Sequence, residues 1–177
     1  MAPVYIALGS NLGDRQANLR AALRLLGPAV RVEAVSALYE SPPQPPAPPP
    51  PYLNAVVRAE TDLEPRALLR HLKAIEARLG RVDTGYWGPR PIDLDIALYD
   101  GLVLDEPDLV IPHARLAERT FVLRPLLDLD PDLTHPRTGE RLDALLTRLD
   151  ATDLNRVAEA GWESEEASSE GNEKAAP

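Results

Sequence analysis

The chain has 177 residues, a length that suits one domain with a short extension, and 44% of them are apolar, enough to form a core. It contains no cysteine, which excludes disulfides, thiolate metal sites and a cysteine nucleophile. The net charge of −9 argues against broad nucleic-acid or membrane binding, which needs basic surface. Because the sequence shows neither a signal-peptide pattern nor a membrane-span pattern, we expect a cytoplasmic protein.

Strand and helix patterns follow one another in an order that defines a fold class. In chain order they are a strand at 4–8, a helix at 15–26, strands at 30–39 and 52–60, a helix at 64–79, a strand at 92–99 and a helical region at about 116–127. The third and fourth segments should pair as an antiparallel hairpin. The order βαββαβ predicts an α+β, ferredoxin-like sandwich, with helices on one face of an antiparallel sheet and additions at the C-terminal end.

Proline is concentrated in the connection between the two hairpin strands. Eight of the ten residues from Pro42 to Pro51 are proline, and only Gln44 and Ala47 interrupt them. Proline fixes φ and lacks an amide donor, so the segment should be an extended, polyproline-like loop. Its composition alone leaves three interpretations open: a stiff connector, a lid over a binding site, or a ligand for a proline-recognition module.

Negative charge is concentrated at the C-terminal end. Residues 151–177 contain seven acidic and two basic side chains, so they carry −5 of the total charge of −9. Much of this segment is polar and has no apolar periodicity, which is typical of disordered chain. We therefore predict one functional domain at 1–150, followed by an acidic, disordered tail at 151–177.

The feature with the clearest chemistry is the carboxylate pair Asp93 and Asp95 in the strand at 92–99. Alternate residues of a strand project to the same face, so both carboxylates should point one way while Leu94 points to the core. Two oxygen ligands of this kind suit Mg²⁺, which takes one or two protein carboxylates together with substrate phosphates. An isolated pair is more often a solvated strand face, so the neighbouring residues must decide between these interpretations.

An arginine lies directly before this pair, in the rigid turn Trp87-Gly88-Pro89-Arg90-Pro91. Arginine suits bidentate contact with phosphate, and a cation beside a two-carboxylate metal site is what transfer of a phosphoryl-type group requires. Further basic side chains that could add to an anion pocket are Arg81, His113, Arg115 and Arg119, of which we assign Arg115 to the exposed surface.

A second cluster follows the proline segment. Tyr52 and Asn54 should share one face of their strand, opposite Leu53. An aromatic ring beside a carboxamide can stack on a flat, polar heterocycle and hydrogen-bond to it. Tyr52 and Phe121, the only phenylalanine in the chain, are each also compatible with ordinary packing.

Taken together, residues 3–150 resemble 6-hydroxymethyl-7,8-dihydropterin pyrophosphokinase, an enzyme family of folate biosynthesis. The most specific motif is G-P-R-x-x-D-x-D, and it is accompanied by ordered motifs on either side. The segments that carry the resemblance are Gly9-Ser10-Asn11-Leu12-Gly13-Asp14-Arg15, Tyr39-Glu40-Ser41-Pro42-Pro43, Tyr52-Leu53-Asn54, Gly88-Pro89-Arg90-Pro91-Ile92-Asp93-Leu94-Asp95, Ile111-Pro112-His113 and Arg119-Thr120-Phe121-Val122-Leu123.

The resemblance implies that ATP donates its β,γ-pyrophosphoryl group to the hydroxymethyl oxygen of the pterin and that AMP leaves. It implies a monomer with no nucleic-acid or membrane partner, with ATP as co-substrate and two Mg²⁺ ions bound by Asp93 and Asp95. The implied catalytic residues are Arg81, Arg90, Asp93 and Asp95. The implied pterin-binding residues are Ser41, Pro42, Gln44, Tyr52, Asn54, Trp87 and Phe121. The implied ATP-binding residues are Glu76, Arg81, Arg90, Ile96, His113 and Arg119.

Two departures from the family concern the loops at about 41–51 and 81–91, which close over the substrates in the family. The first is nearly all proline here, which predicts a stiffer lid that loses less entropy on closure. The second has no basic residue between Arg81 and Trp87, which should either weaken phosphate contact in the closed state or shift that contact onto Arg81 and Arg90.

Two other classes of function would each explain part of the sequence. A ferredoxin-like regulatory or small-ligand-binding module would explain the fold, but not the pair of carboxylates beside Arg90. A scaffold whose prolines bind an SH3-type groove would explain the proline segment, but that segment leads directly into Tyr52 and Asn54.

Overall fold

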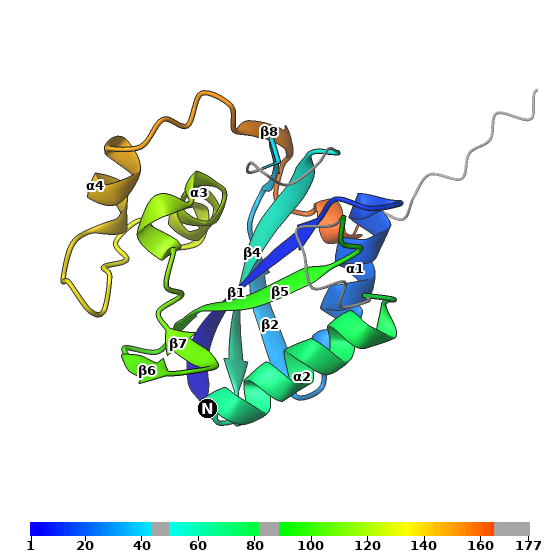
Figure 1. The fold of residues 1–177 in the computed structure, drawn as a ribbon, viewed down its shortest axis with the longest axis horizontal. Helices are drawn as coiled ribbons and strands as arrows, with labels where there is room; N and C mark the ends of the chain where they lie inside the picture. The colour runs from blue at the N-terminus through cyan, green and yellow to red at the C-terminus, as the bar shows by residue number, and fades with distance from the viewer. Residues whose placement is uncertain (44–49, 82–88, 165–177) are drawn as a thin grey trace, which may run out of the picture.

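The computed structural model describes residues 1–43, 50–81 and 89–164 (Figure 1). The strands are β1 (Ala2–Ser10), β2 (Val30–Val35), β3 (Leu38–Ser41), β4 (Tyr52–Thr61), β5 (Asp93–Tyr99), β6 (Leu104–Glu106), β7 (Leu109–Ile111) and β8 (Asn155–Ala158). The helices are α1 (Arg15–Leu26), α2 (Pro65–Arg78), α3 (Thr120–Leu129) and α4 (Leu142–Thr147), with 3₁₀ turns at Leu116–Glu118 and Trp162–Ser164. No helix in the described ranges is long and apolar enough to cross a membrane.

The main sheet is antiparallel and has the order β5-β1-β4-β3-β8, with β2 also paired to β4. β1 lies between β5 and β4 and pairs with β4 from Ala2 opposite Thr61 to Ser10 opposite Leu53. This βαββαβ arrangement confirms the predicted ferredoxin-like sandwich. β6 and β7 form a separate hairpin beside it.

The predicted strand at 30–39 is divided into two strands, β2 and β3, both of which pair with β4. The division lies at Ser36, whose hydroxyl accepts a hydrogen bond from the Val56 amide at 2.9 Å and donates one to the Ala37 carbonyl at 2.8 Å. The Ser36 side chain here takes the place of a backbone carbonyl as the acceptor for the Val56 amide, and serine side chains commonly compete with the backbone in this way. β3 therefore leaves the interruption as a short strand of its own.

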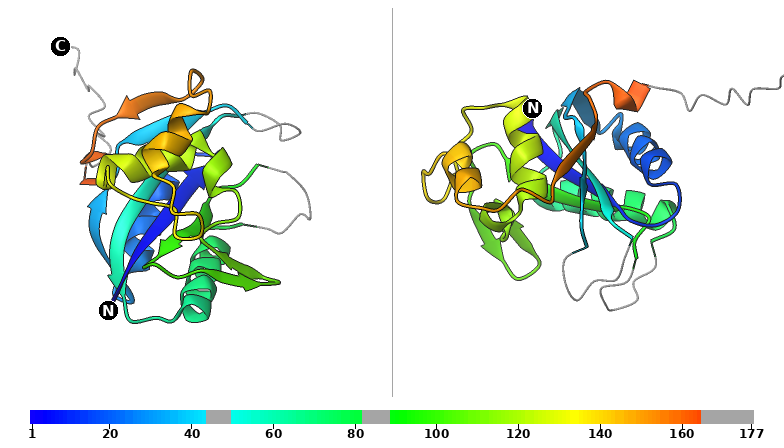
Figure 2. Two further views of the ribbon diagram at one scale, coloured as in Figure 1. Left: turned by 90° about the vertical axis from the view of Figure 1, so that its left-hand side faces the viewer. Right: turned by 90° about the horizontal axis from the view of Figure 1, so that it is seen from above.

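α1 and α2 pack on one face of the sheet, as predicted for the βαββαβ unit, and the main apolar core lies between them and the strands. Asp14 caps α1 by accepting from the Ala17 amide, and Pro65 starts α2, where its missing amide costs nothing. The later helices α3 and α4 pack on the opposite face in a second apolar cluster, and Figure 2 shows α1 and α3 on opposite sides of the sheet.

The prediction of a disordered tail beginning at 151 is wrong for residues 155–164. β8 pairs with β3, and Trp162 is 1% exposed within the main core. The acidic composition of the segment concealed one short strand and one large apolar anchor, because neither produces a repeating apolar pattern. The remainder of the predicted tail, residues 165–177, lies outside the described residues.

Candidate active site

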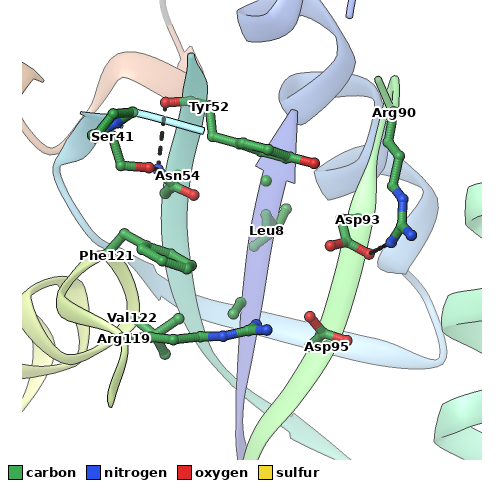
Figure 3. Close-up of a pocket in the computed structure, with 13 residues that line it drawn as sticks. Leu8, Ser41, Tyr52, Asn54, Arg90, Asp93, Asp95, Arg119, Phe121 and Val122 are labelled. Carbon is green, nitrogen blue, oxygen red and sulfur yellow. Dashed lines mark hydrogen bonds and ion pairs between the residues drawn. The ribbon is translucent and has the colours of Figure 1, made fainter. Parts of the chain in front are cut away.

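The floor of a pocket between β4 and β5 is formed by small residues on β1, the strand that lies between them. Ala7 and Gly9 alternate along β1 and line the pocket. Gly9 lies opposite Asn54 on β4 and opposite Asp93 on β5, and Ala7 lies opposite Asp95. Small side chains at the centre leave a hollow that the larger residues of β4 and β5 surround (Figure 3).

Gly9 is also closely approached by its neighbours. A Cβ atom at this position would lie 3.4 Å from Tyr52 Cδ1 and 3.5 Å from Asn54 Oδ1. A longer side chain would therefore extend into space that the pocket uses. The absence of a side chain at Gly9 allows the Tyr52 ring and the Asn54 amide to lie over the floor.

The carboxylates of Asp93 and Asp95 both face the pocket, while Leu94 and Ile96 are buried on the other face of β5. This confirms the alternation predicted for the strand. Asp93 Oδ1 accepts a hydrogen bond from Arg81 Nη1 at 3.0 Å and lies 3.6 Å from Arg90 Nη1. Two arginines therefore compensate Asp93 (Figure 3 shows Arg90).

The negative charge of Asp95 has fewer positive groups near it than that of Asp93. Its nearest basic group is His113 Nε2 at 4.0 Å. Desolvation and the like charge of Asp93 raise the pKa of Asp95 to about 6. Desolvation and nearby Arg119 lower the pKa of His113 to about 4, so the imidazole is neutral at pH 7. In the described ranges, Asp95 thus faces the pocket without an ion pair to any arginine or lysine.

The other end of the pocket is aromatic and carries an amide. Tyr52 comes from β4 and Phe121 from the start of α3, and both rings line the cavity. Asn54, 4% exposed, lies between them on the floor, and its Nδ2 donates to Ser41 Oγ at 2.8 Å. The Arg119 guanidinium lies 5.6 Å from the centre of the Phe121 ring, which brings a cation to the aromatic end.

The pocket thus brings together Ser41, Pro42, Tyr52, Asn54, Arg90, Asp93, Asp95, Arg119 and Phe121 from the predicted site residues. His113 lines a smaller cavity that shares Asp95 and Arg119 with the pocket. Ile96 does not reach the pocket, because its side chain packs in the core between sheet and helices. Gln44 and Trp87 lie outside the described residues, as does most of each predicted lid.

Glu76 and Arg81 form an ion pair beneath Asp93. Glu76 is 2% exposed on α2, and its carboxylate accepts from Arg81 and, at 3.3 Å, from the Leu94 amide. Lys73 Nζ lies 3.5 Å from the same carboxylate. Glu76 does not line the pocket; it fixes Arg81, which in turn holds Asp93.

Replacing Glu76 with glutamine is expected to destabilise the protein by about 2 kcal/mol, since it removes the buried charge that compensates Arg81. Urea denaturation monitored by tryptophan fluorescence would measure the change. The control is Glu118→Gln, which alters an exposed pair with Arg115 and should change the stability by less than about 0.5 kcal/mol. Equal unfolding midpoints for the two variants would contradict the assigned role of Glu76.

Sequence reasoning gave no separate role to Asn11, which connects the ends of both loops. Its side chain is 1% exposed; Oδ1 accepts from the Arg90 amide at 2.7 Å, and Nδ2 donates to the Pro50 carbonyl at 3.4 Å. Arg15 donates to the Pro51 carbonyl at 2.8 Å and pairs with Glu40 at 3.0 Å. The sequence feature that could have indicated this role is the polar turn at the end of β1, with its Gly-Ser-Asn motif.

The donors in the pocket suit a divalent cation that shares its coordination with substrate. In the described ranges, no three His, Cys, Asp or Glu side chains gather closely enough to enclose a metal ion. Mg²⁺ does not need such a cage, because it commonly takes one or two carboxylates together with phosphate oxygens and water. Asp93 and Asp95, side by side with about 27% and 32% of their side chains exposed, fit that coordination.

Fold and pocket together define a class: a ferredoxin-like α+β protein whose sheet presents carboxylates and arginines at one end of a cavity and aromatic and amide groups at the other. The family model for 7,8-dihydro-6-hydroxymethylpterin-pyrophosphokinase matches residues 5–131. The chain belongs to this family.

Curated relatives include both single-function and longer proteins. The chain is 42% identical over 159 residues to 2-amino-4-hydroxy-6-hydroxymethyldihydropteridine pyrophosphokinase of Methylorubrum extorquens, covering 89% of this chain and 99% of that protein. It is 46% identical over 147 residues to folic acid synthesis protein fol1 of Schizosaccharomyces pombe, covering 82% of this chain. The chain spans only 20% of that longer relative.

A solved structure of similar fold is Plasmodium falciparum HPPK-DHPS, wild type, with pterin and p-hydroxybenzoate. It superposes with a TM-score of 0.66 at 15% identity and covers 83% of this chain and 41% of that one. At this level of identity the similarity supports the fold alone.

Proposed function

We propose that the protein transfers the β,γ-pyrophosphoryl group of ATP to the hydroxymethyl oxygen of 6-hydroxymethyl-7,8-dihydropterin, in folate biosynthesis. The observation that carries the proposal is the two-ended pocket, in which a Tyr52–Asn54–Phe121 end adjoins the Asp93–Asp95 pair and Arg90. The first end fits a flat heterocycle with hydrogen-bonding edges, and the second fits a polyphosphate with its cations. Membership in the family supports the assignment.

At the pterin end, the rings of Tyr52 and Phe121 lie against the faces of the heterocycle, and Asn54 hydrogen-bonds its edge. The amide nitrogen of Asn54 is already directed to Ser41 Oγ, so its oxygen is the group left to accept from the pterin. Ser41 and Pro42 close this end of the pocket. Gln44 and Trp87 complete the proposed pterin site from the two lids.

At the phosphate end, Asp93 and Asp95 would hold two Mg²⁺ ions. When bound, Mg²⁺ neutralises phosphate charge and lowers the pKa of a nearby hydroxyl. Arg81 and Arg90 spread the remaining negative charge; both contact Asp93, and phosphate oxygens offer them alternative acceptors. Arg119 and His113 contact ATP from the other side of Asp95. Glu76 acts indirectly, by holding Arg81. Ile96 contacts ATP through its backbone.

The proposed reaction is an in-line displacement at the β-phosphorus. The hydroxymethyl oxygen forms a bond to this phosphorus as the bond to the oxygen between the α- and β-phosphates breaks. AMP leaves with that bridging oxygen, and the hydroxyl proton is released. The protein contributes alignment of the two substrates and compensation of charge, because phosphoryl-type transfer depends mainly on these two effects.

The proposed catalytic unit runs from the N-terminus to residue 164, since β8 and Trp162 pack onto the sheet. We propose that it acts as a monomer, as the resemblance to the family implies.

The test is product analysis with ATP and Mg²⁺, in the presence and absence of hydroxymethyl-dihydropterin. The proposal predicts AMP, with no ADP, and only when the pterin is present. A binding module would bind ligand without turnover, and a kinase of another class would form ADP. Either result would overturn the proposal.

A further inference from the structure

The segment from Asn155 to Trp162, here called the C-terminal strap, connects the C-terminal part of the chain to the pterin end of the pocket. β8 lies at the edge of the sheet beside β3 (Figure 1), with Tyr39 opposite Arg156 and Glu40 opposite Asn155. The backbone of β3 is therefore paired on both sides, with β4 and with β8. Ser41, the last residue of β3, lines the pocket.

Trp162 anchors the end of the strap. Its side chain is 1% exposed in the main core, and its Nε1 donates to the Ser36 carbonyl at 2.9 Å, at the interruption between β2 and β3. Its own carbonyl accepts from Arg20 Nε and Nη2 at 3.1 and 2.8 Å. The strap is thus fixed to α1 and to the backbone that leads into β3.

Arg156 provides a second attachment, to Tyr39. Its guanidinium lies 5.6 Å from the centre of the Tyr39 ring, and Nη2 donates to the Tyr39 hydroxyl at 3.0 Å. That hydroxyl donates in turn to Asp128 of α3, and Arg156 lies 3.5 Å from the same carboxylate. Tyr39, 3% exposed, is therefore held between the strap and α3.

β3 orients the amide of Asn54. Asn54 Nδ2 lies 2.8 Å from Ser41 Oγ, 3.3 Å from the Tyr39 carbonyl and 3.4 Å from the Tyr52 carbonyl, so the two closer acceptors, both on β3, contribute most to the direction of the amide. These contacts leave Oδ1 directed toward the floor beside Gly9. A displacement of β3 would change the orientation of the amide that the pterin meets.

We infer that the C-terminal strap is a positioning element for pterin binding, in which Arg156, through Tyr39, keeps β3 where its acceptors orient Asn54. The inference rests on the proposed function, because it assumes that Asn54 binds the pterin. Arg156 contacts Tyr39 and Asp128 and does not itself line the pocket, so its effect should reach the pocket through β3 and be confined to the pterin.

The test compares Arg156→Ala with Arg148→Ala, whose arginine pairs with Glu140 at 2.8 Å outside the strap. Arg156→Ala should raise the KM for the pterin about fivefold, the loss of roughly one hydrogen bond, and leave the KM for ATP within twofold. Arg156→Lys, which retains one donor for the Tyr39 hydroxyl, should recover part of the loss. Arg148→Ala should leave both KM values unchanged.

A double-variant comparison separates positioning from general destabilisation. If Arg156 acts through the Tyr39 hydroxyl, Arg156→Ala combined with Tyr39→Phe should bind pterin no more weakly than the poorer single variant. Additive effects, or an equal rise in both KM values, would overturn the inference. If the unaltered protein bound pterin but formed no AMP, the proposed function would fail, whereas direct titration of pterin would still test the strap.

Discussion

Replacing Asp95 with asparagine is expected to lower the rate of pterin-dependent AMP formation by about 10³-fold, the largest effect of any single change considered. The variant keeps the size of the side chain and removes one of the two anionic oxygen ligands that face the pocket. Steady-state kinetics at saturating ATP and pterin, over a range of Mg²⁺ concentrations, would measure the change. A higher Mg²⁺ requirement should accompany the lower rate.

The matched control is Asp100→Asn, at an exposed position directly after the same strand. Its left-handed backbone, with φ of 48°, is one that asparagine adopts readily. This variant should retain the activity of the unaltered protein. Full activity in Asp95→Asn would contradict the proposed role of the carboxylate pair in binding Mg²⁺.

Asn54→Ala should raise the KM for the pterin by about 10- to 100-fold and change the KM for ATP by less than threefold. The loss of the amide removes the hydrogen bonds to the Tyr39 carbonyl and Ser41 hydroxyl and a hydrogen bond to substrate, which together should weaken pterin binding by about 1.4–2.7 kcal/mol. Initial rates with each substrate varied in turn would separate the two constants.

Asn54→Asp sharpens the comparison, because the carboxylate has the same shape but cannot donate to β3. Its pterin KM should rise as in the alanine variant. An equal rise in the KM values for ATP and pterin would mean that Asn54 supports the whole pocket and not the pterin end alone.

The parts of the site that alternate along single strands were predictable from the sequence. A period of two residues is enough to place Asp93 and Asp95 on one face, with Leu94 on the other, and the structure confirms this placement. The apolar periodicity of the 15–26 segment likewise predicted α1, whereas the cap at Asp14 became visible only in the structure. Local periodicity carries this information, so no knowledge of distant contacts was required.

The contacts that join distant segments were not predictable in the same way. Asn11 binds the backbone at Arg90 and Pro50, and Glu76 holds Arg81 beneath Asp93. Trp162 is fixed to Ser36 across the chain, although the sequence around it is acidic and polar. Such contacts depend on the packed fold, and a single tryptophan leaves no periodic pattern to detect.

Ile96 illustrates the limit of carrying roles over by resemblance. Its side chain packs in the core, so any contact with ATP must come from its backbone. The residues of the pocket itself were found more reliably, because they are polar or aromatic groups at strand ends and helix starts, where a sheet can present them to a ligand.

The most direct test of the central claim is to follow labelled phosphorus from ATP into the pterin product. With the label at the γ-position, it should appear in the pterin product, and with the label at the α-position it should remain entirely in AMP. The product should carry two phosphorus atoms for each pterin. A product with one phosphorus atom, together with ADP, would contradict pyrophosphoryl transfer.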